Sequence, residues 1–143
     1  MEGLCCTKLP DQLIGLPRLR RLTLIGCTEL AALPAVLGQL PALAHLEVRD
    51  CPIREWSALG QGVPALQALH LAGVGLPPSA VALLAVHRQL KVLCLPDNAL
   101  TELPPDLLHL QQLQQLHLQH NHLQALPAGL PQLPQLQSLR FDH

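Results

Sequence analysis

Three side chains that could bind a metal ion recur at nearly equal spacing along the chain. They are His70, Cys94 and His117, each 23 or 24 residues from the next. Imidazole and thiolate groups are common zinc ligands. If the three residues occupy one position of three neighbouring strands, the two histidines lie about 10 Å apart, which strains a shared ion. We therefore expect unliganded surface residues, no metal site and no cofactor.

The other reactive residue types do not form a catalytic arrangement. Ser57, Ser79 and Ser138 have no evident base and acid partners in the sequence, and residues 73–75 offer two glycines rather than a phosphate-binding loop. Four histidines form a further cluster, which we expect to be a solvated surface stretch. The alternative is a pH-sensitive surface. The sequence therefore predicts that the chain is not an enzyme. The clustered histidines are His109, His117, His120 and His122.

Charge and composition narrow the classes of partner. A net charge of -1 and an aromatic content of 1% exclude a basic groove with base-stacking side chains, so we expect no nucleic-acid partner. No apolar run reaches the length of about 18 residues that a membrane-spanning helix needs, so we expect no membrane partner. The five cysteines, of which Cys5 and Cys6 are adjacent, do not cluster as disulfide caps. This pattern indicates a reducing, cytoplasmic setting, with a secreted bacterial effector in the host cytosol as the alternative.

An internal repeat must position these residues. Six rows align on the pattern Leu-x-x-Leu-x-Leu, and the first two columns hold leucine in every row. Because the last four positions alternate, each row predicts a short strand with its apolar side turned inward. One strand cannot bury that side alone, so the rows must stack about 4.8 Å apart into one parallel sheet. The rows are Leu19-Leu22-Leu24, Leu43-Leu46-Val48, Leu66-Leu69-Leu71, Leu90-Leu93-Leu95, Leu113-Leu116-Leu118 and Leu136-Leu139-Phe141.

A turn position follows each of the first five rows. An asparagine amide there supplies two donors and an acceptor for backbone groups that a tight turn leaves unpaired. Cysteine offers one weak donor, and valine offers none. We therefore expect the third turn to be the least well satisfied, because valine occupies it. The turn residues are Cys27, Cys51, Val74, Asn98 and Asn121.

A Leu-Pro pair completes several units, at residues 9–10, 33–34, 103–104 and 126–127. With this pair the chain resembles the 23-residue, Leu-Pro-containing class of leucine-rich repeats of Scribble-like, plant intracellular Ras-group-related and bacterial proteins. The resemblance implies an α/β solenoid with a curved parallel β-sheet on the concave face. Short helices, 3-10 turns or extended segments then form the convex face. We expect one domain over residues 1–143, with a partial repeat at 1–18, repeats starting near 19, 43, 66, 90 and 113, and an incomplete repeat at 136–143.

Two convex segments carry contrasting signals. Residues 79–87 predict a true helix that Ser79 caps after two prolines. Residues 127–134 contain too many prolines for more than one helical turn.

The outward positions of the strands are the candidate partner-binding surface. Family resemblance implies that this concave face recognises a protein. A small, apolar middle with a polar rim is typical of recognition surfaces. The central outward column is Thr23, Glu47, His70, Cys94, His117 and Arg140. The flanking columns add Arg21, His45, Arg49 and Gln119.

The function predicted from these features is protein–protein interaction with an unidentified partner. One alternative is a substrate-targeting or regulatory segment of a larger signalling enzyme or bacterial effector, such as a kinase or a ubiquitin ligase. Another is a structural solenoid without a partner. Neither end carries the polar cap that solenoids need, so self-association through the ends and a fragment of a longer protein are further expectations.

Overall fold

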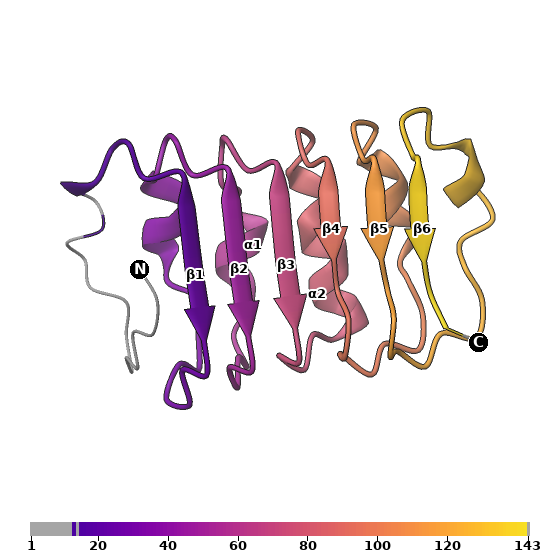
Figure 1. Ribbon diagram of the computed structural model, residues 1–143, viewed down its shortest axis with the longest axis horizontal. Coiled ribbons are helices and arrows are strands. Elements are labelled where there is room, and N and C mark those ends of the chain that lie inside the picture. The colour runs from indigo at the N-terminus through magenta and orange to yellow at the C-terminus, as the bar shows by residue number, and fades with distance from the viewer. Residues whose placement is uncertain (1–12, 14, 143) are drawn as a thin grey trace.

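The computed structural model describes residues 13 and 15–142, which Figure 1 shows as a row of parallel strands. Within this range the strands form one six-stranded sheet in chain order. Each predicted row forms one strand, so the parallel repeat sheet is confirmed. Most of the partial repeat expected at 1–18, including the Cys5-Cys6 pair, lies outside the described residues. The strands are β1 (Arg21–Ile25), β2 (His45–Arg49), β3 (Ala68–Ala72), β4 (Val92–Cys94), β5 (Gln115–His117) and β6 (Ser138–Arg140).

The spacing of the rows sets the register of the sheet. Leu22 pairs with Leu46, and the same column continues through Leu69 to the last strand. A slip of one residue would turn every leucine outward, so the buried side of the sheet strongly favours this register. The predicted central column is confirmed, because its six residues pair in sequence across the sheet. That column is Thr23, Glu47, His70, Cys94, His117 and Arg140.

Leucine side chains form a continuous core behind the sheet. Leu46, Leu69, Leu93 and Leu116, one from each of the four inner strands, are fully buried. Burying a leucine stabilises a fold by roughly 2 kcal/mol, so the stacked rows are the main source of stability. In β6 the equivalent Leu139 is only partly buried, because a strand pairs with one side of β6 alone.

The convex side opposite the sheet carries short helices (Figure 1). The helix α2 (Pro78–Leu83) begins on a proline, which the first helical position tolerates because its N–H needs no partner there. Its N-cap is Pro77, and no side chain caps it, so the expectation that Ser79 caps a helix over 79–87 is wrong. The last part of that segment is the 3-10 turn η3 (Leu84–Val86).

The remaining convex elements are single turns. The proline-rich segment 127–134 contains only a three-residue 3-10 turn, as its prolines predict. No helix among the described residues has the length and apolar character needed to cross a membrane. These elements are η2 (Ala35–Gln39), α1 (Ser57–Gly60), η4 (Pro105–His109) and η5 (Leu130–Gln132).

Each of the first five strands leads into a residue with a left-handed backbone. Glycine adopts this conformation without steric cost, and aspartate and histidine tolerate it better than most residues. The repeated left-handed residue turns the chain away from the sheet at the same place in every unit. These residues have φ between 51° and 62° and are Gly26, Asp50, Gly73, Asp97 and His120.

The amide of Asn98 holds the turn of the preceding repeat. Its Oδ1 accepts hydrogen bonds from the backbone N–H groups of Val74 and Leu76, both at 3.2 Å. Its Nδ2 donates to the carbonyl oxygens of Leu71 at 2.6 Å and Pro96 at 3.0 Å. The side chain at the turn position therefore reaches back one repeat.

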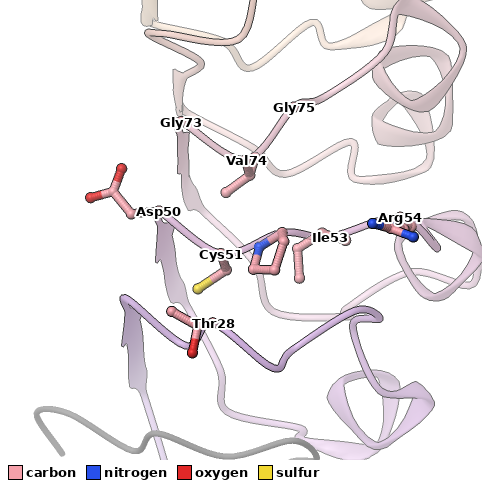
Figure 2. A pocket seen from close by; sticks show the side chains of 9 residues that line it. Thr28, Asp50, Cys51, Ile53, Arg54, Gly73, Val74 and Gly75 are labelled. Atoms are coloured by element: carbon pink, nitrogen blue, oxygen red, sulfur yellow. The ribbon is translucent and has the colours of Figure 1, made fainter.

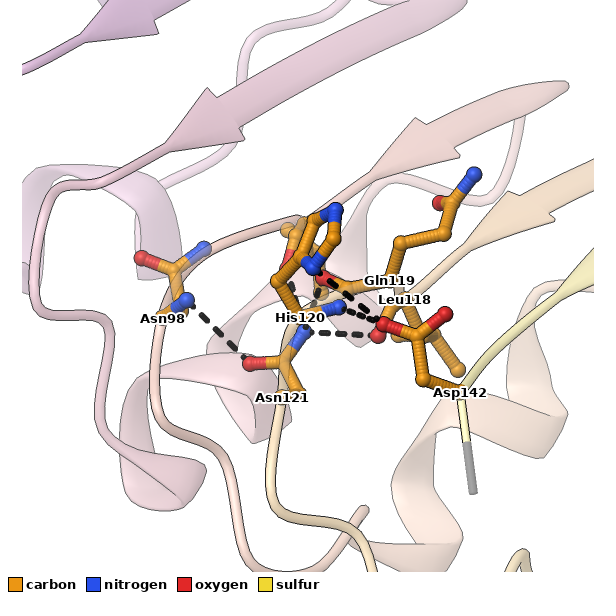
Figure 3. Close-up of polar contacts among 7 residues, drawn as sticks. Asn98, Leu118, Gln119, His120, Asn121 and Asp142 are labelled. Atoms are coloured by element: carbon orange, nitrogen blue, oxygen red, sulfur yellow. Dashed lines mark hydrogen bonds and ion pairs between the residues drawn. The ribbon is translucent and has the colours of Figure 1, made fainter.

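Asn121 makes the same contacts one unit later (Figure 3). It accepts from the backbone N–H groups of Asn98 at 3.2 Å and Leu100 at 2.9 Å. It also donates to the carbonyl oxygen of Leu95 at 2.8 Å. The two asparagines thus form a ladder that joins three successive repeats.

This ladder corrects the expectation for the third turn. Val74 is not in the least satisfied turn, because Asn98 serves the backbone there. The side chain of Val74 cannot form hydrogen bonds, so the second turn lacks the amide contacts that Asn98 gives the third. In that turn the N–H of Ile53 donates to the carbonyl oxygen of Cys51 at 2.9 Å. An asparagine at position 74 would offer this N–H a side-chain acceptor instead.

Candidate functional site

The concave face is the outward side of β1 to β6, which the convex helices leave uncovered (Figure 1). Nine of the ten candidate residues lie in these strands, and Gln119 follows β5 by two residues. They differ in exposure. The side chains of Arg21, His45, Arg49 and Arg140 are exposed, those of Thr23, Glu47, His70, His117 and Gln119 are half-buried, and that of Cys94 is buried.

Two small residues form the floor of the concave face. Ala68 and Cys94 lie at outward positions of β3 and β4, yet they are only 5% and 7% exposed. The Sγ atom of Cys94 lies 3.4 Å from Nδ1 of His117, its register partner on β5. The thiol expected on the surface is therefore covered, and the larger side chains around it form the accessible rim.

The electrostatics of this pair favour neutral groups. Burial raises the pKa of the Cys94 thiol, although the nearby guanidinium groups of Arg140 and Arg49 act in the opposite direction. Burial lowers the pKa of His117, and Arg140 lowers it further. A protonated thiol therefore faces a neutral imidazole at neutral pH.

His70 lies on the other side of Cys94 in the same column. Burial lowers its pKa, and the neighbouring Glu47 carboxylate partly offsets that effect. Glu47 is itself paired with the guanidinium of Arg49. The rim therefore holds one ion pair beside two histidines that are neutral at neutral pH.

Comparisons with known proteins agree with this geometry. The family model described as "Leucine rich repeat" matches residues 88–143. A solved structure of a leucine-rich-repeat protein of Leptospira interrogans superposes on 91% of the chain with a TM-score of 0.75 and 29% sequence identity. The described chain has the leucine-rich-repeat fold, and residues 88–143 match the leucine-rich-repeat family.

This leucine-rich-repeat chain spans about a third of the Leptospira protein, 34% of its length. The comparison with curated proteins gave no match. Leucine-rich repeats are common protein–protein interaction modules, and proteins of this fold are typically not enzymes.

Within residues 13 and 15–142, no group of three or more His, Cys, Asp or Glu side chains is arranged to hold an ion. His70, Cys94 and His117 share a column, but only the Cys94–His117 pair is in hydrogen-bonding contact.

At the end of this column, Asp142 binds the turn that follows β5 (Figure 3). Its carboxylate accepts a hydrogen bond from the backbone N–H of His120 and lies 3.4 Å from Nδ1 of the same residue. This contact engages the carboxylate that follows β6.

Sequence reasoning missed an open groove of about 590 Å³ at the carboxyl ends of β1 to β3 (Figure 2). Its lining includes Cys51 and Val74, two of the three turn residues that are not asparagine. The non-asparagine turn positions and the glycines at 73 and 75 were the signal for it. The lining residues are Thr28, Asp50, Cys51, Pro52, Ile53, Arg54, Gly73, Val74 and Gly75.

Proposed function

We propose that this leucine-rich-repeat chain is a protein-binding module that engages its partner through the concave face. The observation that carries the proposal is the contrast within that face. Ala68 and Cys94 form a covered, small-residue floor, whereas arginine and histidine side chains stand exposed around it. A desolvated centre with a polar rim is the arrangement found in protein interfaces.

A regulatory or targeting segment within a larger protein is the second candidate function. It is supported by the similarity to about a third of a longer leucine-rich-repeat protein. In this case the concave face would bring a partner to another domain, such as a kinase or a ubiquitin ligase.

A reducing, cytoplasmic setting forms part of the proposal, and delivery into a host cytosol is its alternative. It is supported by Cys51 and Cys94, which are buried and form no disulfide.

A matched pair of substitutions tests the concave face. Gln115 is exposed on β5, and Gln39 is exposed on the convex side at the end of η2. In proximity labelling from cells that express the chain, Gln115→Trp should remove the specific partners because it adds bulk to the interface without adding charge. Gln39→Trp should keep the same partners. The proposal fails if both variants recover the same set, or if only Gln39→Trp loses partners.

A further inference from the structure

The contact between Cys94 and His117 bears on the position of the imidazole proton. A buried thiol with a raised pKa stays protonated at neutral pH and can donate its hydrogen to Nδ1 of His117, which lies 3.4 Å from the sulfur. We assign this arrangement to the pair, and in it the neutral ring carries its proton on Nε2. The pair therefore presents one N–H group toward the side of the ring away from the sulfur.

This N–H group has no acceptor. Nε2 of His117 is shielded from solvent and makes no hydrogen bond to any of the described residues. A buried donor without an acceptor costs about 1–3 kcal/mol. The free chain therefore holds a polar group on its concave face that a bound acceptor would satisfy.

Positive charge lies beside the same place. Arg140 is the register partner of His117 on β6, and its guanidinium is close enough to lower the pKa of the imidazole. Arg49 on β2 acts on the Cys94 thiol in the same direction, although its guanidinium is paired with Glu47. The carboxylates of Glu47 and Asp142 are both engaged, since Asp142 binds the His120 turn.

We propose that the concave face recognises an acidic segment of a partner protein, and that one aspartate or glutamate carboxylate of this segment binds between Nε2 of His117 and the guanidinium of Arg140. The inference rests on the proposed protein-binding function and adds the chemistry of the partner. A carboxylate supplies the acceptor that the imidazole lacks and pairs with an arginine side chain. Arg140 is exposed, so moving its side chain to admit the carboxylate disturbs little packing.

The floor indicates what flanks the carboxylate. Val92 begins β4, the strand next to β5, and Ala68 and Ala72 lie on β3, one strand further along the sheet. These side chains carry no polar atoms and leave room for small apolar groups of the partner. We therefore expect acidic residues alternating with small apolar ones in an extended segment.

Binding should take up a proton at His117. The charged and titratable groups that face its ring are Cys94 on β4 and Arg140 on β6, and His70 contributes from β3. Arg140 and burial keep the free imidazole neutral, whereas a bound carboxylate favours its charged form. Affinity should therefore rise as the pH falls toward the ordinary pKa of histidine.

Selection from a phage-displayed library of random peptides about 12 residues long tests the proposal. The immobilised chain should enrich peptides rich in Asp and Glu, and their affinity should then be measured by fluorescence anisotropy. Arg140→Gln should weaken their binding by about tenfold, because it removes the charge that pairs with the carboxylate. Arg88→Gln, which changes an exposed arginine in the turn between η3 and β4, should leave the affinity unchanged.

The pH dependence gives a second readout that a structural role would not move. Wild-type binding should strengthen several-fold between about pH 7.5 and about pH 5.5. His117→Gln keeps a side-chain N–H donor but cannot be charged, so most of this gain should disappear. Circular dichroism of each variant confirms that the fold persists.

Other outcomes separate the two proposals. Peptides without acidic enrichment whose binding Gln115→Trp abolishes would overturn the carboxylate site and leave the protein-binding function standing. Acidic peptides that bind Arg140→Gln as tightly as the wild type would also overturn the site. Peptides that bind regardless of Gln115→Trp would count against both proposals, as would the absence of any bound peptide.

Discussion

The turns of the N-terminal and C-terminal repeats use different chemistry at the same position. In the C-terminal half, Asn98 and Asn121 each bond two N–H groups and one strand-end carbonyl of the preceding repeat. In the N-terminal half, the Cys51 thiol reaches only carbonyls, at 3.2 Å to Arg49 and 3.9 Å to Leu24. The cysteine thiol therefore replaces the N–H donor of the asparagine amide but not its oxygen acceptor.

This difference shows that each turn depends on the next repeat. An asparagine stabilises the backbone of the preceding repeat, so it contributes to the interaction free energy between two adjacent repeats. The C-terminal turns are consequently tied together, and the open groove lies at the N-terminal turns, where the amides are absent (Figures 2 and 3). Four substitutions or conditions test how much stability this contrast carries, beginning with the largest expected effect.

Replacing Asn98 with leucine should cause the largest loss. The substitution removes four hydrogen bonds and leaves buried groups of the third turn, including the N–H of Val74, without partners. We expect the free energy of unfolding to fall by about 3 kcal/mol, as measured by urea denaturation. Cys51→Ala, which removes only weak thiol contacts, should cost about 1 kcal/mol. Equal losses at the two positions would contradict the comparison.

Val74→Asn should convert an N-terminal turn into the C-terminal type. The new amide would offer an acceptor to the N–H groups of Cys51 and Ile53 and a donor to the carbonyl of Val48, by analogy with Asn98. We expect a gain of about 1 kcal/mol, seen as a rise of about 3 °C in the melting temperature. Val74→Thr is the control, because its shorter polar group should not reach the preceding turn. A lower melting temperature for the asparagine variant would show that the amide cannot be accommodated there.

The well-bonded C-terminal turns carry one strained residue. Ala99 has φ of 56°, at the position where the preceding repeat has Gly75 with φ of 68°. Ala99→Gly should relieve the steric cost of the left-handed backbone and raise the free energy of unfolding by about 0.5 kcal/mol. Ala125 is equally exposed and has no positive φ, so Ala125→Gly should be neutral or destabilising. Chemical denaturation of both variants decides whether the strain is relieved.

Acid pH should destabilise the fold through histidines outside the turns. His87 is 4% exposed, its Nδ1 lies 3.1 Å from the carbonyl of Leu84, and burial lowers its pKa. The unfolded chain then binds the proton more tightly, so the free energy of unfolding should fall as the pH drops below about 6.5 and level off below the folded-state pKa. His70 and His117 have lowered pKa values and contribute with the same sign.

Melting temperatures between about pH 7 and about pH 5 measure this dependence. His87→Leu should flatten the profile, and His109→Leu, at an exposed position on η4, should not change it. If His87→Leu left the slope unchanged, the buried imidazole would not be a source of acid sensitivity.

The repeat made much of this fold predictable from sequence. The constant spacing of the rows defined the strands, and the alternation within each row placed Glu47, His70 and Cys94 in one outward column. Such features are local or periodic, so one strand and its spacing to the next are enough to infer them. The identity of the outward residues did not reveal which of them are accessible.

Contacts between repeats decided the remainder. The sequence suggested that each turn residue serves its own turn, whereas Asn98 reaches the turn before it, because the offset between stacked units brings its amide beside Val74. Cys94 is outward in pattern but buried, because His117 and its neighbours cover it. Periodicity in the sequence determined the sheet, its register and the leucine core. The stacking of the units decided the burial of Cys94, its contact with His117 and the hydrogen bonds of the turns, since each depends on atoms that lie 21 to 27 residues away in the chain.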